Sequence, residues 1–311
     1  MCELIIETKA LTKNFGRIAA VKGVNLKVPK KAIYGFLGPN GAGKSTTIRM
    51  LLDLIKPTRG EVYVFGKDIR KHRMEILRKV GSLVEAPSYY GNLTAYENLE
   101  ITRRVLQIDR KEIDRALEIV NLLKWKNTKV KNFSLGMKQR LGIAQASLGP
   151  RELLILDEPT NGLDPAGVKE IRSLILNLPK ITGVTVFISS HILSEIEQIA
   201  DYVGIIRSGE LLFQGALDEL RGKTSPELVI MANPVEKAQV FIREMGLEVI
   251  NREGKLYVPK GAITAEELNR ALVLKGFGVS HLSESKKNLE EIFLELTGGG
   301  SDAGILSASK Q

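Results

Sequence analysis

Apolar residues form short continuous runs at three places in the first two thirds of the chain. These are AIYGFLG (32–38), ELLILD (152–157) and VTVFISS (184–190), and such runs are typical of strands buried on both faces. Between the last two, AGVKEIRSLILNL (166–178) has apolar residues three and four positions apart, which is the spacing of a helix. Strand, helix and strand in that order predict a parallel sheet covered by helices on both sides.

Other stretches around this core follow different patterns. LIIETKALTKNF (4–15) and VNLKVP (24–29), with a turn signal at Lys22-Gly23, predict edge strands. TAYENLEITRRVL (94–106) and IDRALEIVNLL (113–123) have helical spacing, and residues 88–150 are predicted to be mostly helical.

The composition changes near RGKTSPE (221–227), which indicates a linker. The chain beyond it predicts a strand, a helix, a hairpin and two helices, at 227–232, 235–246, 247–259, 264–276 and 288–298. The Gly- and Ser-rich end is typical of disorder. We therefore expect three parts: a large domain at 1–222, a small α+β domain at 223–298, and a disordered tail at 299–311.

Composition and charge exclude some classes of protein. With 43% hydrophobic and 26% charged residues the chain is typical of soluble globular proteins, and no apolar run reaches the roughly 18 residues of a membrane-spanning helix. The start, MCELIIETK, does not predict a secretory signal, and the single cysteine, Cys2, excludes an intramolecular disulfide. The net charge of +9 is compatible with a polyanionic partner or with a role in solubility alone.

One glycine-rich stretch lies between a predicted strand and a predicted helix. It matches the phosphate-loop pattern G-x-x-x-x-G-K-[ST], in which glycines let backbone N–H groups point at phosphates. Lys44 would reach the β- and γ-phosphates, and the Ser45 hydroxyl would ligate Mg²⁺. The predicted nucleotide-binding residues are Gly38, Pro39, Asn40, Gly41, Ala42, Gly43, Lys44, Ser45 and Thr46. ATP and Mg²⁺ are the expected cofactors.

Two carboxylates end the second apolar run. Buried charges are costly unless they are paired or bound to metal, so Asp157 is predicted to hold Mg²⁺, and Glu158 to polarise the water that attacks the γ-phosphate. The alternative is that both acids only cap the turn before Pro159.

One further motif points to a particular protein family. It reads Asn132-Phe133-Ser134-Leu135-Gly136-Met137-Lys138-Gln139-Arg140. The chain resembles the ATP-binding subunit of an ABC transporter, whose motif reads L-S-G-G-Q, often followed by K-Q-R. The resemblance implies an α/β P-loop ATPase domain, with a mainly parallel mixed sheet, an antiparallel β subdomain and a helical subdomain. It also implies that Ser134 and Gly136 contact the γ-phosphate held by an opposing subunit. Leu135 and Met137 depart from the family pattern, and Ser134 is also a plausible helix N-cap.

The resemblance assigns four further residues, each with a simpler alternative. Asp164 belongs to the loop that crosses the dimer, although it is also a good N-cap before a proline. His191 would contact the γ-phosphate, whereas a lone histidine at a strand end is more often structural. Phe15 would stack on adenine or pack on an edge strand. Glu85 occupies the position of the family glutamine that joins the nucleotide to the membrane subunit, and would be a Mg²⁺ ligand or a solvated loop residue.

Residues 3–220 show the family motifs in order. Several of these motifs look most like those of the ATPase subunits of bacitracin-type resistance exporters and lantibiotic self-protection transporters. The examples are E-A-P (85–87), N-L-T-A-Y-E-N-L (92–99) and S-S-H-I-L-S-E-I-E (189–197). This implies a cytoplasmic ATPase dimer, formed with itself or with a similar subunit, attached to the inner face of the membrane through a permease. No nucleic acid partner is then expected. The alternatives are a soluble ABC ATPase that acts on nucleic acid or the ribosome, and a non-catalytic nucleotide-binding module.

Overall fold

The computed structural model describes residues 3–85, 88–222, 227–259, 261 and 263–285. Contacts divide the chain into two compact units, Met1–Leu217 and Asp218–Gln311, which we describe separately. No helix among the described residues is both long enough and apolar enough to cross a membrane.

The first unit contains eleven strands, seven α-helices and two short 3-10 helices among its described residues. The strands are β1 (Leu4–Phe15), β2 (Ile18–Val24), β3 (Lys27–Pro29), β4 (Ile33–Leu37), β5 (Arg59–Val64), β6 (Lys67–Asp68), β7 (Val80–Leu83), β8 (Leu153–Asp157), β9 (Thr185–Ser190), β10 (Tyr202–Arg207) and β11 (Glu210–Ala216). The helices are α1 (Lys44–Leu51), α2 (Ile69–Lys79), α3 (Ala95–Leu106), α4 (Lys111–Ile119), η1 (Leu123–Trp125), η2 (Val130–Asn132), α5 (Leu135–Ala146), α6 (Pro165–Thr182) and α7 (Leu193–Glu197).

A six-stranded sheet forms the centre of this unit, in the order β11-β10-β4-β9-β8-β7. All neighbouring pairs are parallel except β10 with β11. Every residue of β4, β8 and β9 is buried, and Phe187 stacks on Tyr34 with ring centroids 5.4 Å apart. Burial on both faces explains the continuous apolar runs, and the predicted mainly parallel sheet is confirmed.

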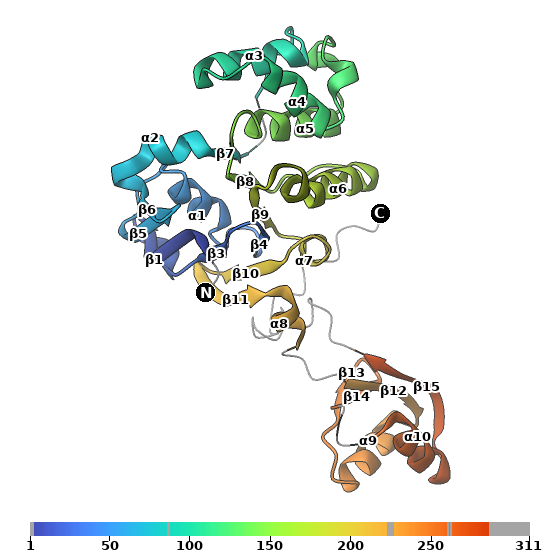
Figure 1. Ribbon diagram of the computed structural model, residues 1–311. Helices are drawn as coiled ribbons and strands as arrows, with labels where there is room; N and C mark the ends of the chain where they lie inside the picture. The colour runs from blue at the N-terminus through green and yellow to red at the C-terminus, as the bar shows by residue number, and fades with distance from the viewer. Residues whose placement is uncertain (1–2, 86–87, 223–226, 260, 262, 286–311) are drawn as a thin grey trace. The chain divides into compact units, whose positions relative to one another are not determined.

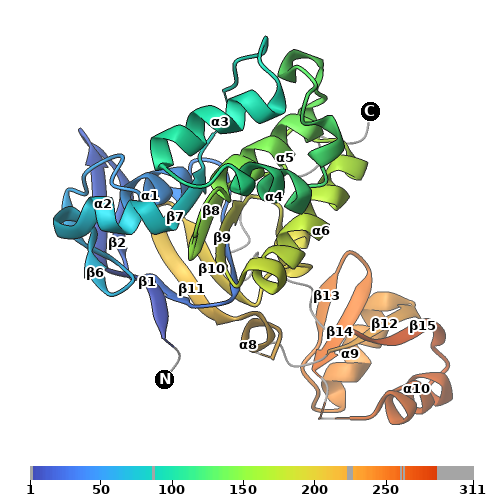
Figure 2. The same cartoon turned by 45° about the horizontal axis from the view of Figure 1, so that its top comes forward.

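A second, antiparallel sheet has the order β2-β1-β5-β6, with β3 also paired to β1 (Figures 1 and 2). The predicted strand at 4–15 is β1, but the expected turn at Lys22-Gly23 is wrong because β2 continues to Val24. The β1–β2 pairing shifts register between Leu11 and Lys13 and again between Lys13 and Asn14. These irregularities accommodate Gly23, whose φ is +62°, without ending the strand.

Helices α3, α4 and α5 lie together at one end of the unit, beside α6 (Figures 1 and 2). Helix α3 begins at the capping box of Thr94 and Glu97, which confirms the predicted helix at 94–106. The helix predicted at 113–123 is interrupted: α4 ends at Ile119, and Asn121 has the left-handed φ of +57° that commonly follows a helix.

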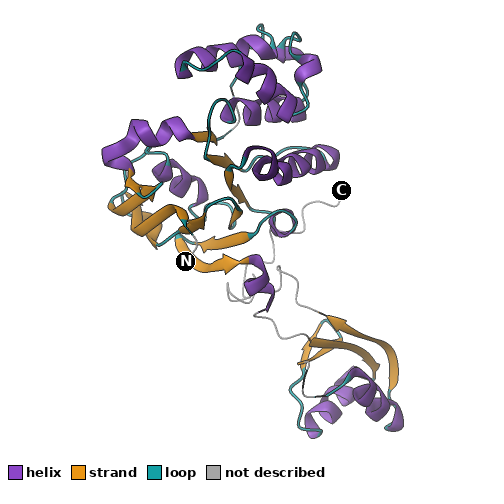
Figure 3. Cartoon of the chain, viewed as in Figure 1, coloured by secondary structure: helices purple, strands orange, loops and turns teal. Residues whose placement is uncertain are grey.

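The second unit contains α8 (Leu217–Gly222, which begins at the boundary), β12 (Glu227–Asn233), α9 (Val235–Glu244), β13 (Ile250–Arg252), β14 (Lys255–Pro259), α10 (Ala265–Leu274) and β15 (Gly278–Ser285). Its antiparallel sheet has the order β13-β14-β12-β15, and both long helices cover one face of it (Figure 3). From β12 onward, the β-α-β-β-α-β sequence in this strand order is the ferredoxin-like arrangement. The predicted hairpin and two helices are present, β15 was not predicted, and the helix predicted at 288–298 and the tail lie outside the described residues.

Candidate functional site

The glycine-rich turn after β4 brings backbone close to backbone. A Cβ added to Gly38 would lie 2.2 Å from the carbonyl oxygen of Ile206, and one added to Gly43 would lie 2.5 Å from that of Ala20. Gly43 also has a φ of +105°, which side chains rarely tolerate. Only glycine fits these two positions, and the turn therefore presents bare backbone in front of α1.

The N-terminus of α1 is open to an anion. Among the described residues, no side chain caps it, and its first turn contains no acidic residue. The unpaired N–H groups and the helix dipole make such an end a binding site for phosphate. The hydroxyls of Ser45 and Thr46 are half-buried in this first turn.

Lys44 is held at the same place by oxygen atoms. Its side chain is only 4% exposed, and its Nζ donates to the carbonyl oxygens of Gly38 (2.8 Å) and Pro39 (3.2 Å). Nζ also lies 3.1 Å from Oε1 of Glu158. A buried ammonium needs such partners, and phosphate oxygens are acceptors of the same kind.

The end of β8 carries the two predicted acids, and β9 supports both. Asp157 is buried, and its Oδ1 accepts a hydrogen bond of 2.5 Å from Ser189 Oγ. The backbone N–H of Glu158 donates to the same Ser189 oxygen at 2.9 Å. Glu158 has a φ of +46°, a left-handed conformation that is uncommon for glutamate and redirects its side chain at the strand end. The roles of Asp157 toward Mg²⁺ and of Glu158 toward the attacking water stay predictions.

The Glu158 carboxylate lies between two other predicted residues. Oε1 is 3.1 Å from Lys44 Nζ, and Oε2 is 3.1 Å from His191 Nδ1. Lys44, Glu158 and His191 follow β4, β8 and β9, whose carboxyl ends meet at one edge of the sheet. Ligands of open α/β sheets bind at this edge. The glutamate is thus placed for proton transfer beside a cation and an imidazole.

The donor chemistry of Asp157 and Ser45 fits Mg²⁺. Asp157 offers a carboxylate and Ser45 a hydroxyl, which are the hard oxygen ligands that Mg²⁺ prefers. Among the described residues, no group of three or more His, Cys, Asp or Glu side chains could form a metal cage. Ser45 and Asp157 are the residues that would hold Mg²⁺.

The Ser134 motif starts α5, and it contacts the loop after β8 within the same chain. Ser134 Oγ accepts a hydrogen bond of 3.2 Å from the N–H of Met137, which makes it an N-cap. Leu135 is 52% exposed, and its Cδ2 is 3.5 Å from the position of a Cβ built on Gly162. The departure from the family pattern at Leu135 therefore faces the loop that precedes α6. The contacts of Ser134 and Gly136 with an opposing subunit stay predictions.

Asp164, Phe15 and Glu85 have defined local surroundings. Asp164 Oδ1 accepts a hydrogen bond of 2.9 Å from the N–H of Gly167 and caps α6, so the N-cap role is present. Phe15 is 51% exposed at the end of β1, with Lys13 Nζ 5.1 Å from its ring centroid, which leaves a ring face available for stacking. The roles of both residues toward nucleotide or an opposing subunit stay predictions.

Glu85 forms an ion pair with Arg49 of α1, the helix that begins at Lys44. It is 65% exposed and has a left-handed φ of +67°. Shortly after it, Tyr89 Oη donates to the backbone oxygen of Lys138 in α5 at 2.8 Å, and burial raises the pKa of Tyr89, so it remains a neutral donor. Glu85 thus contacts α1 and Tyr89 contacts α5, and the Mg²⁺ role of Glu85 stays a prediction.

Sequence reasoning missed four supporting residues. Ser189 bridges Asp157 and Glu158, while the buried Glu195 accepts from Thr160 Oγ1 (2.7 Å) and Ser190 Oγ (3.4 Å). Hydroxyl residues at the end of an otherwise apolar strand were the available signal. Their partners could not be identified without knowing which strand lies beside β9.

The fold and the site define a P-loop ATPase, and comparisons with known proteins specify the family. A family model described as ABC transporter matches residues 21–161. The bacitracin transport ATP-binding protein BcrA of Bacillus licheniformis is 48% identical over 301 residues, covering 95% of this chain and 98% of that protein. The lantibiotic transport ATP-binding protein SrtF of Streptococcus pyogenes is 42% identical over 214 residues, covering 69% and 92%.

A solved structure supports the same assignment. The dimeric post-hydrolysis state of the ATP-binding cassette MJ0796 bound to ADP and Pi matches with a TM-score of 0.61 and 28% identity, covering 68% of this chain and 98% of that chain. The chain belongs to the ATP-binding proteins of ABC transporters. It is an ATPase subunit that binds nucleotide.

Truncation after Lys223 tests whether the first unit is sufficient. All the phosphate-site residues lie before Leu217, and a cut after Lys223 keeps α8 whole. We expect the shortened protein to fold and to bind ATP within about threefold of the full-length affinity. Isothermal calorimetry and thermal unfolding would measure both properties, and loss of binding in a folded truncated protein would contradict the proposed domain boundary.

Proposed function

We propose that this chain powers an exporter for a peptide antibiotic, a lantibiotic or a similar drug-like amphiphile. The observation that carries the ATPase part is the Glu158 carboxylate between Lys44 and His191 at the open N-terminus of α1. The relatives named for bacitracin and lantibiotic transport support the cargo class. No observation favours action on nucleic acid or the ribosome.

Each residue of the site has a task in this proposal. Lys44 exchanges its contacts with Glu158 and two carbonyl oxygens for phosphate oxygens, which frees the carboxylate. Glu158 then accepts a proton from the attacking water. His191 contacts the γ-phosphate, orients it and stabilises its charge. Bound Mg²⁺ would supply charge stabilisation of the phosphates, with Ser45 and Asp157 as its protein ligands.

The subunit works as a dimer in this proposal, with ATP between the phosphate loop of one chain and Ser134 and Gly136 of the other. The dimeric form of MJ0796 supports this arrangement. Leu135 against Gly162 joins the α5 N-terminus to the loop before Asp164, so both would reach an opposing subunit together. The dimer would attach to the cytoplasmic face of the membrane through a separate permease.

Purification from native membranes tests the proposal. We expect the chain to co-purify with one protein that has about six apolar stretches of roughly 20 residues. In the reconstituted complex, bacitracin or the lantibiotic nisin should stimulate ATP hydrolysis, whereas a complex carrying Lys44→Ala should show no stimulated activity. Recovery with ribosomes or nucleic acid, and no permease, would contradict the proposal.

A further inference from the structure

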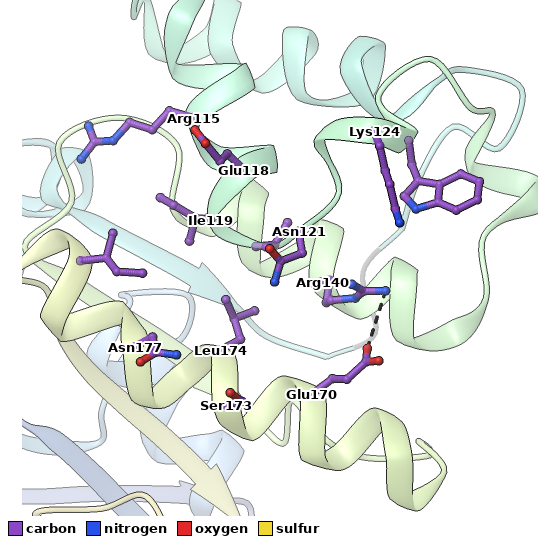
Figure 4. Close-up of a pocket in the computed structure, with 13 residues that line it drawn as sticks. Arg115, Glu118, Ile119, Asn121, Lys124, Arg140, Glu170, Ser173, Leu174 and Asn177 are labelled. Atoms are coloured by element: carbon purple, nitrogen blue, oxygen red, sulfur yellow. Dashed lines mark ion pairs between the residues drawn. The ribbon is translucent and has the colours of Figure 1, made fainter.

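A cavity in the first unit lies outside the predicted nucleotide site. It has a volume of about 880 Å³ and lies between α4 and η1 on one side and α6 on the other, with Arg140 of α5 reaching into it (Figure 4). Its lining contains none of the residues assigned to ATP or Mg²⁺. Pockets for small molecules have volumes of about 300–1,000 Å³, so this one is large enough for a ligand.

The cavity has an excess of positive charge. Arg115, Lys124 and Arg140 line it, against two carboxylates, those of Glu118 and Glu170. Figure 4 marks one ion pair between the lining residues drawn, that of Arg140 with Glu170. Arg140 Nη2 lies 3.7 Å from Glu170 Oε2, which is longer than a hydrogen bond. Arg115 pairs with Glu112 outside the lining, with Nη1 3.5 Å from Oε2, so a carboxylate or phosphate would approach Lys124 and Arg140.

Arg140 also has an unused donor. Its Nε is buried, and it has no hydrogen-bond partner among the described residues. A buried N–H without an acceptor costs about 1–3 kcal/mol, and because Nε is buried a ligand would meet the guanidinium through the 20% of the side chain that is exposed. The amide side chains of Asn121 and Asn177, which face the cavity from opposite sides, offer further donors (Figure 4).

The rest of the lining is apolar. Ile119, Leu174 and Ile181 contribute aliphatic surface, and Trp125 of η1 contributes an indole that is 41% exposed. Arg140 and the cations near it, together with an apolar wall, complement a molecule that has one anionic head and one apolar body. A nucleotide, with several charges and a polar sugar, fits this lining less well.

We propose that this cavity binds a dissolved single-chain anionic amphiphile, such as a fatty acid or an alkyl phosphate. Its head would lie on Arg140, with Lys124 and Arg115 nearby, and its chain along Leu174 and Trp125. Arg140 belongs to α5, the helix that Ser134 caps. The ligand would therefore compete with Glu170 for a side chain of that helix.

The chain's single tryptophan, Trp125, makes the test specific because it lies in the cavity wall. The probe is dansylaminoundecanoic acid, a fluorescent fatty acid that accepts energy from tryptophan. With the full-length protein we expect saturable energy transfer that ATP with Mg²⁺ does not displace. Trp125→Phe removes the only energy donor and gives the blank for direct excitation of the probe, whereas displacement by ATP would overturn the proposal.

Matched variants test the anion contacts. Arg140→Gln should lower the affinity for the probe about tenfold or more, as expected for the loss of a hydrogen bond to a charged group. Lys124→Gln should weaken it less, and Lys169→Gln, an exposed residue of α6 outside the lining, should leave it unchanged. If Arg140→Gln fails to fold, Lys124→Gln and Arg115→Gln carry the test, since both side chains are exposed. Equal binding in all variants would overturn the proposal.

Two further measurements define the ligand. The methyl ester of the probe, which lacks the charge, should bind at least about tenfold more weakly than the acid. Vesicles that contain phosphatidylglycerol should leave the Trp125 emission unchanged, because a bilayer lipid cannot leave its membrane for the cavity. Equal binding of the ester would contradict the proposal that the ligand has an anionic head. A change in Trp125 emission on adding vesicles would contradict the proposal that the ligand is a dissolved molecule.

Discussion

Lys44→Ala is expected to lower ATP hydrolysis by about 100-fold or more. The substitution removes the cation at the end of the phosphate loop, and preorganised charge of this kind is worth about 10²–10³ in rate. It also leaves the Glu158 carboxylate without one of its two partners. Steady-state phosphate release at saturating ATP and Mg²⁺ would measure the effect.

The matched control is Lys71→Ala, which removes an exposed lysine of α2 far from the site in sequence and should retain full activity. Thermal unfolding of both variants separates loss of catalysis from loss of folding. If a folded Lys44→Ala protein kept more than about a tenth of the wild-type rate, the assignment of the phosphate loop would be wrong.

Glu158→Gln is expected to separate ATP binding from hydrolysis. The amide keeps an oxygen that can accept from Lys44, but it is a much weaker base than the carboxylate. General base catalysis contributes about 10²–10⁴ in rate, so turnover should fall by about 100-fold or more. ATP binding should survive, and the bound state should accumulate as a dimer visible by sedimentation velocity.

Glu152→Gln is the control, because Glu152 immediately precedes β8 and lies at the opposite end of the same strand. We expect wild-type turnover and no ATP-dependent accumulation of dimer. A Glu158→Gln protein that binds ATP and stays monomeric at saturating ATP and Mg²⁺ would contradict the sandwich dimer for the isolated chain.

Local patterns were sufficient to predict the phosphate loop and the acids of β8. The spacing of Gly38, Gly43 and Lys44 specifies a strand, a turn and a helix that are consecutive in the chain, so no distant contact is needed to form them. The apolar run before Asp157 identifies a buried strand in the same way. Burial and backbone geometry act within a few residues here, and sequence reasoning succeeds for that reason.

Strand pairing decided the rest of the site. Glu158 meets Lys44 and His191 because β9 lies between β4 and β8, an order that no local pattern contains. The same pairing places Ser189 beside both acids of β8. Parallel neighbours are joined by long crossovers, so their order depends on how whole helices pack on the sheet.

The sequence by itself determined which residues could offer charged groups, hydroxyls and backbone N–H groups to a phosphate. Only the tertiary structure decided which of them meet: Arg49 with Glu85, Leu135 with Gly162, and Arg140 with Glu170 across a cavity. In each pair the partners come from different elements, and their approach follows from the packing of those elements rather than from local propensity. Residue type and spacing are properties of the chain, whereas these contacts are properties of the packed fold.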